Sequence, residues 1–272
     1  MSNVKLICIF LALVSCNKKH DAANEKTHND SVIVYNEADL YKIKTGKIKV
    51  IDTSCLLAEK RAGKDISESK WTYTLVYGMG LHDYSNREMK SLLSGHSIAL
   101  DSFLSPCARP PKGFRWHCYA DLMNRAIEKR FGEKFIDSLR HIADIRFINN
   151  NPHFIMPFYE CDMTSRYAAA KSYDDFLKKP EDDFLNNLND TGLSKKQLKK
   201  QRANTEVTFI IFRDGSIGHI KSENNGSIAT NSDFAKYFER EALNFVKRAK
   251  WIPALYRGIK VNSKMRLNLY NK

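Results

Sequence analysis

The stretch that most constrains the fold is the C-terminal run of residues 205–270. Val207, Phe209 and Ile211 alternate through a segment that is β-branched or aromatic at most positions, as expected for a pleated strand. Asp214-Gly215 follows and predicts a hairpin turn, because glycine accepts the positive φ that such turns require. The chain then returns as a second strand at 217–221.

A helix is expected next, with Ser232 or Asn231 as its N-cap and Asp233 in its first turn. Its apolar residues share one face: Phe234, Phe238, Ala242, Phe245, Val246 and Ala249. Pro253 stops any continuation of the helix, and a closing alternating strand follows. These elements predict an α+β fold with a ββαβ domain, in which one helix covers a small antiparallel sheet.

The order of these elements resembles the C-terminal domain of the TonB family. The matching pieces begin with the alternating first strand, and the later ones are Asp214-Gly215, Glu241-Ala242-Leu243, Trp251-Ile252-Pro253-Ala254, Gly258-Ile259-Lys260-Val261 and Leu267-Asn268-Leu269-Tyr270. The resemblance covers about a quarter of the chain. The alternative is a ββαβ domain of another lineage.

The resemblance implies a binding role. In the TonB family this domain grips outer-membrane receptors, and a short receptor peptide adds as a strand beside the last strand of the domain. By position the binding edge is then the closing strand: Lys264, Met265, Arg266, Leu267, Asn268, Leu269 and Tyr270. The alternative for this edge is a charged strand that merely resists aggregation.

The N-terminus has the pattern of an export signal, over residues 1–16. Lys5 gives a positive start, and the apolar run 6–14 is too short to span a bilayer. It ends in Leu13-Val14-Ser15-Cys16, which resembles a bacterial lipobox and predicts acylation of Cys16. An ordinary cleaved signal, with Cys16 incidental, is the alternative. Residues 17–31 are polar and predict a tether.

Residues 32–200 are expected to form an α+β region of unknown family before the C-terminal domain, 201–272. The predicted strands are 32–35 and 71–77, with a hairpin around Thr45-Gly46, and the predicted helices are 119–131, 133–145 and a weaker acidic one at 173–188. The basic segment 194–202 is expected to be the link between the two regions.

Six cysteines are present, of which Cys8 would leave with the signal. Apart from Cys16, four remain: Cys55, Cys107, Cys118 and Cys161. An oxidising compartment makes disulfides the first hypothesis, with three possible pairings. The turn Pro110-Pro111-Lys112-Gly113 favours the pairing 107–118, which leaves 55–161.

No metal, cofactor or enzyme is predicted. Trp116-His117-Cys118 matches no zinc spacing and lacks a second ligand pair. Cys118 has no local signature of a thiol nucleophile, and the acidic residues 181–183 lack calcium-loop spacing. An enzyme in the 50–200 region would need a pocket that holds His117, Cys118 or these acidic residues.

The net charge of +13 is high. Residues 201–272 hold 13 Lys and Arg against 6 Asp and Glu, so +7 of it lies in the C-terminal quarter. A solvated basic face, attraction to anionic lipid or cell wall, and nucleic-acid binding compete as explanations, but an exported chain rarely meets nucleic acid. We therefore expect no nucleic-acid partner.

Together these features predict an envelope lipoprotein that faces the periplasm, anchored in the outer membrane rather than the inner one. It is expected to act as a non-catalytic protein-binding module in receptor-linked transport. TonB-family energisers carry a transmembrane helix and a long spacer, which a lipid anchor and a short tether replace here, so an energising role is not expected. The alternative is a structural protein whose basic domain binds peptidoglycan or another envelope component.

Overall fold

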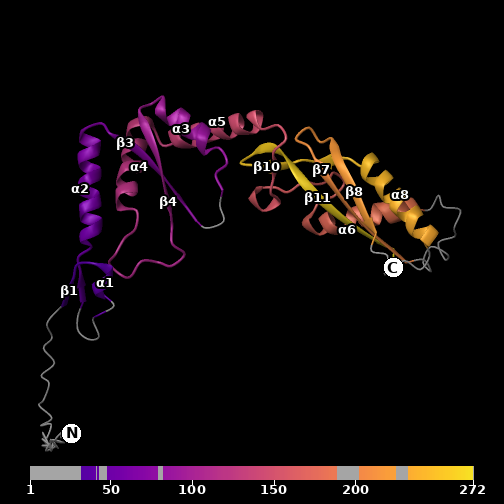
Figure 1. The fold of residues 1–272 in the computed structure, drawn as a ribbon, viewed down its shortest axis with the longest axis horizontal. Helices are drawn as coiled ribbons and strands as arrows, with labels where there is room; N and C mark the ends of the chain where they lie inside the picture. Colours follow the sequence, from indigo (N-terminus) through magenta and orange to yellow (C-terminus); the bar gives the residue numbers. More distant parts are fainter. Residues whose placement is uncertain are drawn as a thin grey trace, which may run out of the picture.

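The computed structural model is an elongated α+β molecule (Figure 1). It describes residues 32–40, 42, 48–78, 82–188, 202–224 and 232–271. The predicted α+β class is confirmed. The predicted signal, Cys16, the tether and most of the basic link lie outside the described residues, so those predictions stay predictions.

The first half of the described chain contains short strands and four longer helices. Its elements are β1 (Val32–Val34), α1 (Glu37–Leu40), β2 (Ile48–Val50), α2 (Thr53–Ser67), β3 (Trp71–Tyr77), α3 (Asn86–Ser94), β4 (Ile98–Leu104), α4 (Cys118–Phe131) and α5 (Phe135–Asn150).

The second half contains a larger sheet and two long helices. Its elements are β5 (Ile155–Met156), the 3-10 helix η1 (Phe158–Glu160), β6 (Arg166–Tyr167), α6 (Tyr173–Asn187), β7 (Ala203–Ile211), β8 (Ile217–Asn224), α8 (Ser232–Arg248), β9 (Trp251–Ile252), β10 (Ala254–Tyr256) and β11 (Ile259–Asn271).

A parallel pair of strands forms the centre of the first half. β3 and β4 pair in register from Trp71 with Ile98 to Tyr77 with Leu104, and α3 makes the crossover between them. Helices α3, α4 and α5 bury their apolar faces with this pair in one core: Trp71, Met89, Leu93, Ile98, Met123, Ile127, Ile136, Leu139 and Ala143. The predicted strand 71–77 has the observed bounds, and the predicted helix 119–131 differs from α4 by one residue.

Two local expectations in this half change. α5 runs on to Asn150, because Phe147 and Ile148 continue its apolar contacts and Asn151 then closes the last turn on the Phe147 carbonyl. β2, expected to form a hairpin around Thr45-Gly46, pairs in parallel with β1 instead. Residues 43–47 of that expected hairpin lie outside the described part.

The C-terminal sheet has the strand order β10-β11-β7-β8, with β5 beside β11. β7 and β11 pair antiparallel over nine residues, from Ser263 opposite Ile211 to Asn271 opposite Ala203. β7 and β8 are joined by a turn at Asp214-Gly215, where Gly215 has φ +87°. Alternation along β7 and β11 gives the sheet one buried face and one open face.

Two helices, α6 and α8, cover the buried face. Phe184 of α6 lies 5.0 Å from Phe238 and 5.7 Å from Phe245 of α8, measured between ring centroids. Their shared core includes Val207, Phe209, Ile211, Leu267 and Leu269 from the sheet. The sequence predicted a single helix; a second is present because α6 supplies the aromatic and aliphatic side chains that complete this core.

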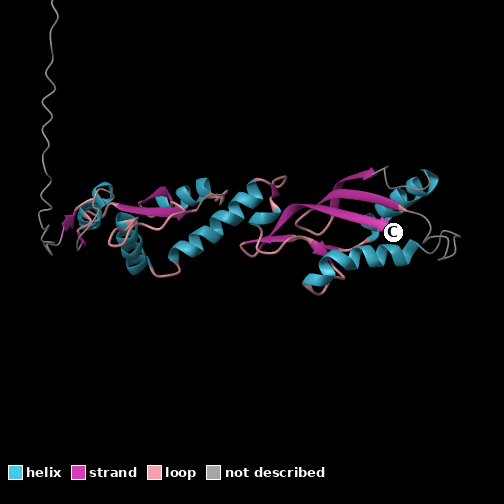
Figure 2. Cartoon of the chain, turned by 90° about the horizontal axis from the view of Figure 1, so that it is seen from below, coloured by secondary structure: helices cyan, strands magenta, loops and turns pink. Residues whose placement is uncertain are grey.

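The sheet also extends into the region before residue 201. β5 pairs in parallel with β11, placing Ile155 and Met156 opposite Asn262 and Ser263, and β6 pairs antiparallel with β9. Because β5, β6 and α6 all pack with the C-terminal sheet, the C-terminal part of the fold begins at about residue 155. In Figures 1 and 2 the long helix α5 leads from the first half into this part.

A charged cluster links the two halves at the β10–β11 turn. Arg257, in the left-handed region with φ +47°, pairs with Asp83 and, at 3.4 Å, with Asp144 of α5. The Asp144 side chain is fully buried and also accepts a hydrogen bond from the Ser85 hydroxyl. A buried carboxylate is costly without such partners, so Arg257 neutralises it and holds the turn against α5.

We expect Arg257→Ala to lower the free energy of unfolding by roughly 3 kcal/mol, because it leaves the Asp144 carboxylate buried without its cation. Adding Asp144→Asn should recover part of the loss. Urea titration followed by circular dichroism measures both. Arg213→Ala is the matched control, since the Arg213 side chain is exposed and donates a hydrogen bond of 3.1 Å to the neutral side chain of Asn149. Equal losses from both arginine changes would contradict the role of the cluster.

Candidate functional site

The candidate site is the edge of β11 that faces away from β7. From Lys264 to Leu269, β7 is the only strand that pairs with β11 in the described part of the chain. Earlier in β11, β10 pairs with residues 259–261 and β5 with residues 262–263, and at Ser263 β5 and β7 occupy opposite edges of the strand. In an antiparallel strand every second residue directs its N–H and C=O away from its partner, so this edge offers backbone groups to another strand.

A groove of about 500 Å³ runs along this edge. On the β11 side it is lined by Ser263, Lys264, Met265 and Arg266. At Ser263, β7 occupies one edge of β11 and β5 the other. Phe158, which follows β5 by two residues, also lines the groove, so the groove lies at the edge that β5 leaves open beyond Ser263.

The opposite wall comes from residues that precede the sheet in sequence: Phe158, Thr164, Ser165 and Phe176. Three contacts fix this wall. The buried hydroxyls of Ser165 and Ser263 share a hydrogen bond, and Met163 and Leu255 exchange backbone hydrogen bonds of 3.3 and 2.8 Å. Ser172 and Asp175 form a capping box at the start of α6, one turn before Phe176.

The groove combines apolar surface with positive charge. Phe158, which lines the groove, is 66% exposed. Lys264 and Arg266 are exposed at the mouth, and Arg266 lies 3.2 Å from Glu206. Of the described residues that line the groove, none carries a carboxylate. Such a groove suits an extended segment with apolar and acidic side chains.

A second hollow, of about 670 Å³, lies on the open face of the same sheet. Its floor includes Ile210 and Phe212. Four basic or histidine side chains surround it, which are His153, His219, Lys221 and Lys264, and its described lining contains no acidic residue. His219 has φ +51° at the β-bulge between β7 and β8, a geometry that re-aims a side chain.

The predicted edge residues fall on two faces of β11. Lys264, Arg266 and Asn268 are exposed on the open face, whereas Leu267 and Leu269 are buried toward the helices. Met265 and Tyr270 are half-buried. The groove wall was not predicted. Phe158 and Tyr159 form an exposed aromatic pair after Pro157 in the sequence, but only the fold brings Phe158 to the groove beside β11.

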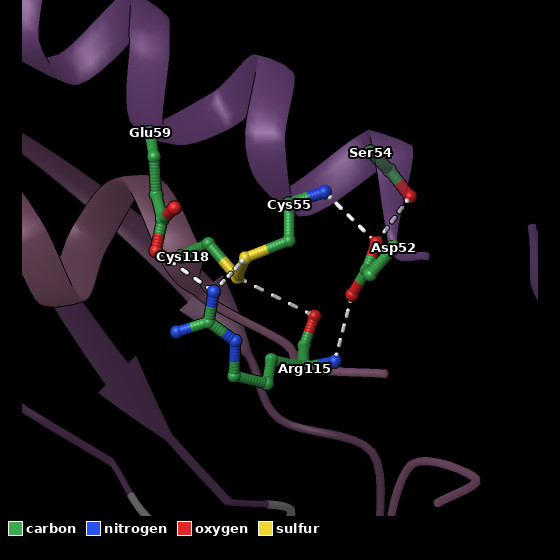
Figure 3. The surroundings of a disulfide bond; sticks show 6 residues. All are labelled: Asp52, Ser54, Cys55, Glu59, Arg115 and Cys118. Atoms are coloured by element: carbon green, nitrogen blue, oxygen red, sulfur yellow. Dashed lines mark hydrogen bonds and ion pairs between the residues drawn. A yellow bond between two sulfur atoms is a disulfide. The ribbon is translucent and has the colours of Figure 1, made fainter. Parts of the chain in front are cut away.

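The disulfide joins Cys55, in the first turn of α2, to Cys118 at the start of α4 (Figure 3). The favoured pairings 107–118 and 55–161 are therefore wrong. Cys107 is an exposed thiol and Cys161 a half-buried one. The turn at residues 110–113 does not close on Cys107, because His117 adopts φ +64° and α4 begins there with Cys118 packed against α2.

Arg115 and Asp52 surround this disulfide (Figure 3). The Arg115 guanidinium lies 2.9 Å from the Cys55 sulfur and 2.8 Å from Glu59. Asp52 caps α2 by accepting from the N–H of Cys55 at 2.9 Å, and it accepts from the N–H of Arg115 at 2.8 Å. Burial opposes ionisation of Asp52, but these hydrogen bonds outweigh it and hold its pKa below the ordinary value.

The chemistry around the cysteines follows from this pairing. Asp52, Cys55 and Cys118 lie close together, but both sulfurs are bonded to each other, so neither is a thiol nucleophile or a metal ligand. At Cys161, burial together with Asp162 and Glu160 raises the pKa of the thiol to about 11. That thiol therefore stays protonated near neutral pH.

No family model matches the chain, and no curated protein matches it. Among the described residues, no helix has the length and apolar character that crossing a bilayer requires.

We expect Cys55→Ser to lower the free energy of unfolding by about 4 kcal/mol, because the bond closes a loop with a sequence separation of 63 residues. Urea titration without reductant measures this, and Cys107→Ser is the control, with no change expected. Peptide mapping of the unreduced protein should yield the 55–118 linked peptide. A linked peptide containing Cys107 would contradict the assignment.

Asp52→Ala should cost about 1–2 kcal/mol at neutral pH, through loss of the helix cap. Because the folded pKa of Asp52 is depressed, its contribution is present above the ordinary value of 3.8 and is lost as pH falls through the folded pKa. The difference from the unsubstituted protein should therefore shrink between pH 7 and pH 3 in urea titrations. Asp182→Ala, on the exposed side of α6, is the control. A difference that does not change with pH would rule out the ionised cap.

Proposed function

We propose that the protein is an envelope lipoprotein whose C-terminal domain binds a partner protein by strand addition at β11, without catalysis. The partner is an outer-membrane receptor or another envelope protein, and the role is in receptor-linked transport. The proposal rests on the edge of β11 that faces away from β7. At residues Lys264–Leu269 no described strand pairs with this edge, and the groove lies beside it.

The order of elements supports this proposal. β7, β8 and α8 follow one another, and the chain reaches β11 after the short strands β9 and β10, an order compatible with the ββαβ arrangement that the resemblance to the TonB C-terminal domain implies. In that family a receptor peptide adds beside the last strand, which is β11 here. Backbone hydrogen bonds would give the affinity and alternate side chains the selectivity.

In this proposal the protein is attached to the membrane by acyl chains on Cys16, at the end of the lipobox-like segment. Acyl chains on a cysteine, with two or more per anchor, hold a protein stably at a bilayer. We infer a periplasm-facing location, at the outer rather than the inner membrane. Lipid anchoring leaves no span through which to draw on a proton gradient, so the proposed role is to bind rather than to energise.

A second candidate function rests on the open face of the sheet. Lys221, Lys264 and two histidines surround a hollow whose described lining is free of carboxylates. Such a face attracts anionic polymers, which supports a structural protein that holds peptidoglycan or another anionic envelope component. Lys264 borders both the hollow and the groove, so the two functions would compete for the same surface.

The test is site-specific photo-crosslinking in living cells, with the probe at Asn268 on β11. A matched probe at Lys236, exposed on α8, is the control. We expect a discrete adduct with one outer-membrane protein from Asn268 alone, because an added strand would lie against this residue. Cell-wall adducts alone would instead support the second candidate, and identical adducts from both positions would contradict strand addition.

A further inference from the structure

We propose that the groove selects the strand that adds to β11, and that it takes a segment with a bulky apolar residue flanked by two acidic residues. This inference rests on the proposed strand addition. It goes further by giving the region before the C-terminal domain a part in the site, since Phe158 and Phe176 precede residue 201.

The alternation of β11 sets the pattern. Side chains that are opposite each other on paired strands lie on the same face of a sheet. A residue opposite Met265 therefore points to the helix side, where Met265 is half-buried and Phe176 of α6 lines the groove. Its two neighbours point to the open face, beside Lys264 and Arg266.

The apolar residue expected in the added strand is inferred from the two phenylalanine side chains that line the groove. Phe158 remains 66% exposed, although a phenyl ring gains from leaving water. Phe158 and Phe176 line the same groove of about 500 Å³, enough for an aromatic or long aliphatic side chain. The wall is also fixed in place by the buried hydroxyl pair of Ser165 and Ser263, so the pocket exists before a partner arrives and costs little ordering.

The acidic positions follow from charge. Lys264 has no carboxylate partner among the residues that the structure describes, and Arg266 shares its charge with Glu206 across an exposed contact of 3.2 Å. Lys264 and Arg266 are the residues immediately before and after Met265, and both lie on the open face. They match two acidic residues that flank the apolar residue of an added strand in the same way. Basic residues at those positions would meet repulsion.

The experiment measures binding of fluorescent synthetic peptides to the full-length protein in detergent, by fluorescence anisotropy. The parent peptide carries Glu-Phe-Glu between short Thr-rich flanks. One variant has Ser in place of Phe, and another has Lys in place of both Glu residues. We expect each variant to bind about tenfold more weakly or worse, as befits loss of an aromatic anchor or of charge complementarity.

Two protein variants assign the selectivity to the groove. Phe158→Ala should weaken binding of the Phe peptide about tenfold and leave the Ser peptide unchanged. Tyr159→Ala, which removes an equally exposed neighbouring ring that does not line the groove, should change neither. Lys264→Glu should remove most of the preference for the Glu peptide over the Lys peptide, because Arg266 is then the one remaining cation of the pair.

Equal affinities for all peptides, or equal effects of Phe158→Ala and Tyr159→Ala, would overturn the selective groove. Failure of every peptide to bind would overturn it as well. The crosslink from Asn268 then separates the two ideas: an adduct with an outer-membrane protein keeps strand addition without this selectivity, and loss of the adduct removes both.

Discussion

The antiparallel pairing of β7 with β11 is the interaction on which the C-terminal half depends. Nine consecutive residue pairs fix the register, and a slip of one residue would turn Leu267 and Leu269 out of the core. The same register exposes Lys264 and Arg266 on the open face and leaves the far edge of β11 facing the groove. Core, charge pattern and free edge are therefore consequences of one strand pairing.

Electrostatics connects this half to the first. Asp144 is buried in α5, where a carboxylate is stable only with compensating partners. Arg257 reaches it from the turn between β10 and β11, the hairpin that begins the long strand. The position of the sheet relative to α5 is thus tied to a residue adjacent to the strand that carries the candidate site. The disulfide at Cys55 and Cys118 plays a comparable part for α2 and α4, at the other end of the molecule.

Local patterns allowed several elements to be predicted from the sequence. The spacing of Phe234, Phe238 and Ala242 predicts α8, and the alternation before Asn271 predicts the later part of β11.

What the sequence does not reveal is long-range placement. Nothing local links Cys55 to Cys118, because their approach follows from the packing of α2 on α4. α6 has a weak apolar pattern of its own, and its membership of the core is decided by Phe184 meeting the rings of α8. The groove wall was not predicted for the same reason, because Phe158 is distant from β11 in the sequence and lines a groove with it only in the folded chain.

An open strand edge is by itself an unselective binding site, because every extended peptide offers the same backbone groups. Lysine and arginine along the edge discourage pairing with another copy of the chain, which would bring like charges together. Selection of one partner requires side-chain contacts beside the edge, and the sheet alone has few there. The residues between α5 and β7 supply them, held to the sheet by the pairing of β5 with β11, of β6 with β9 and by the Ser165–Ser263 contact. We therefore infer that the segment before β7 contributes side chains to the proposed binding site and is more than a spacer.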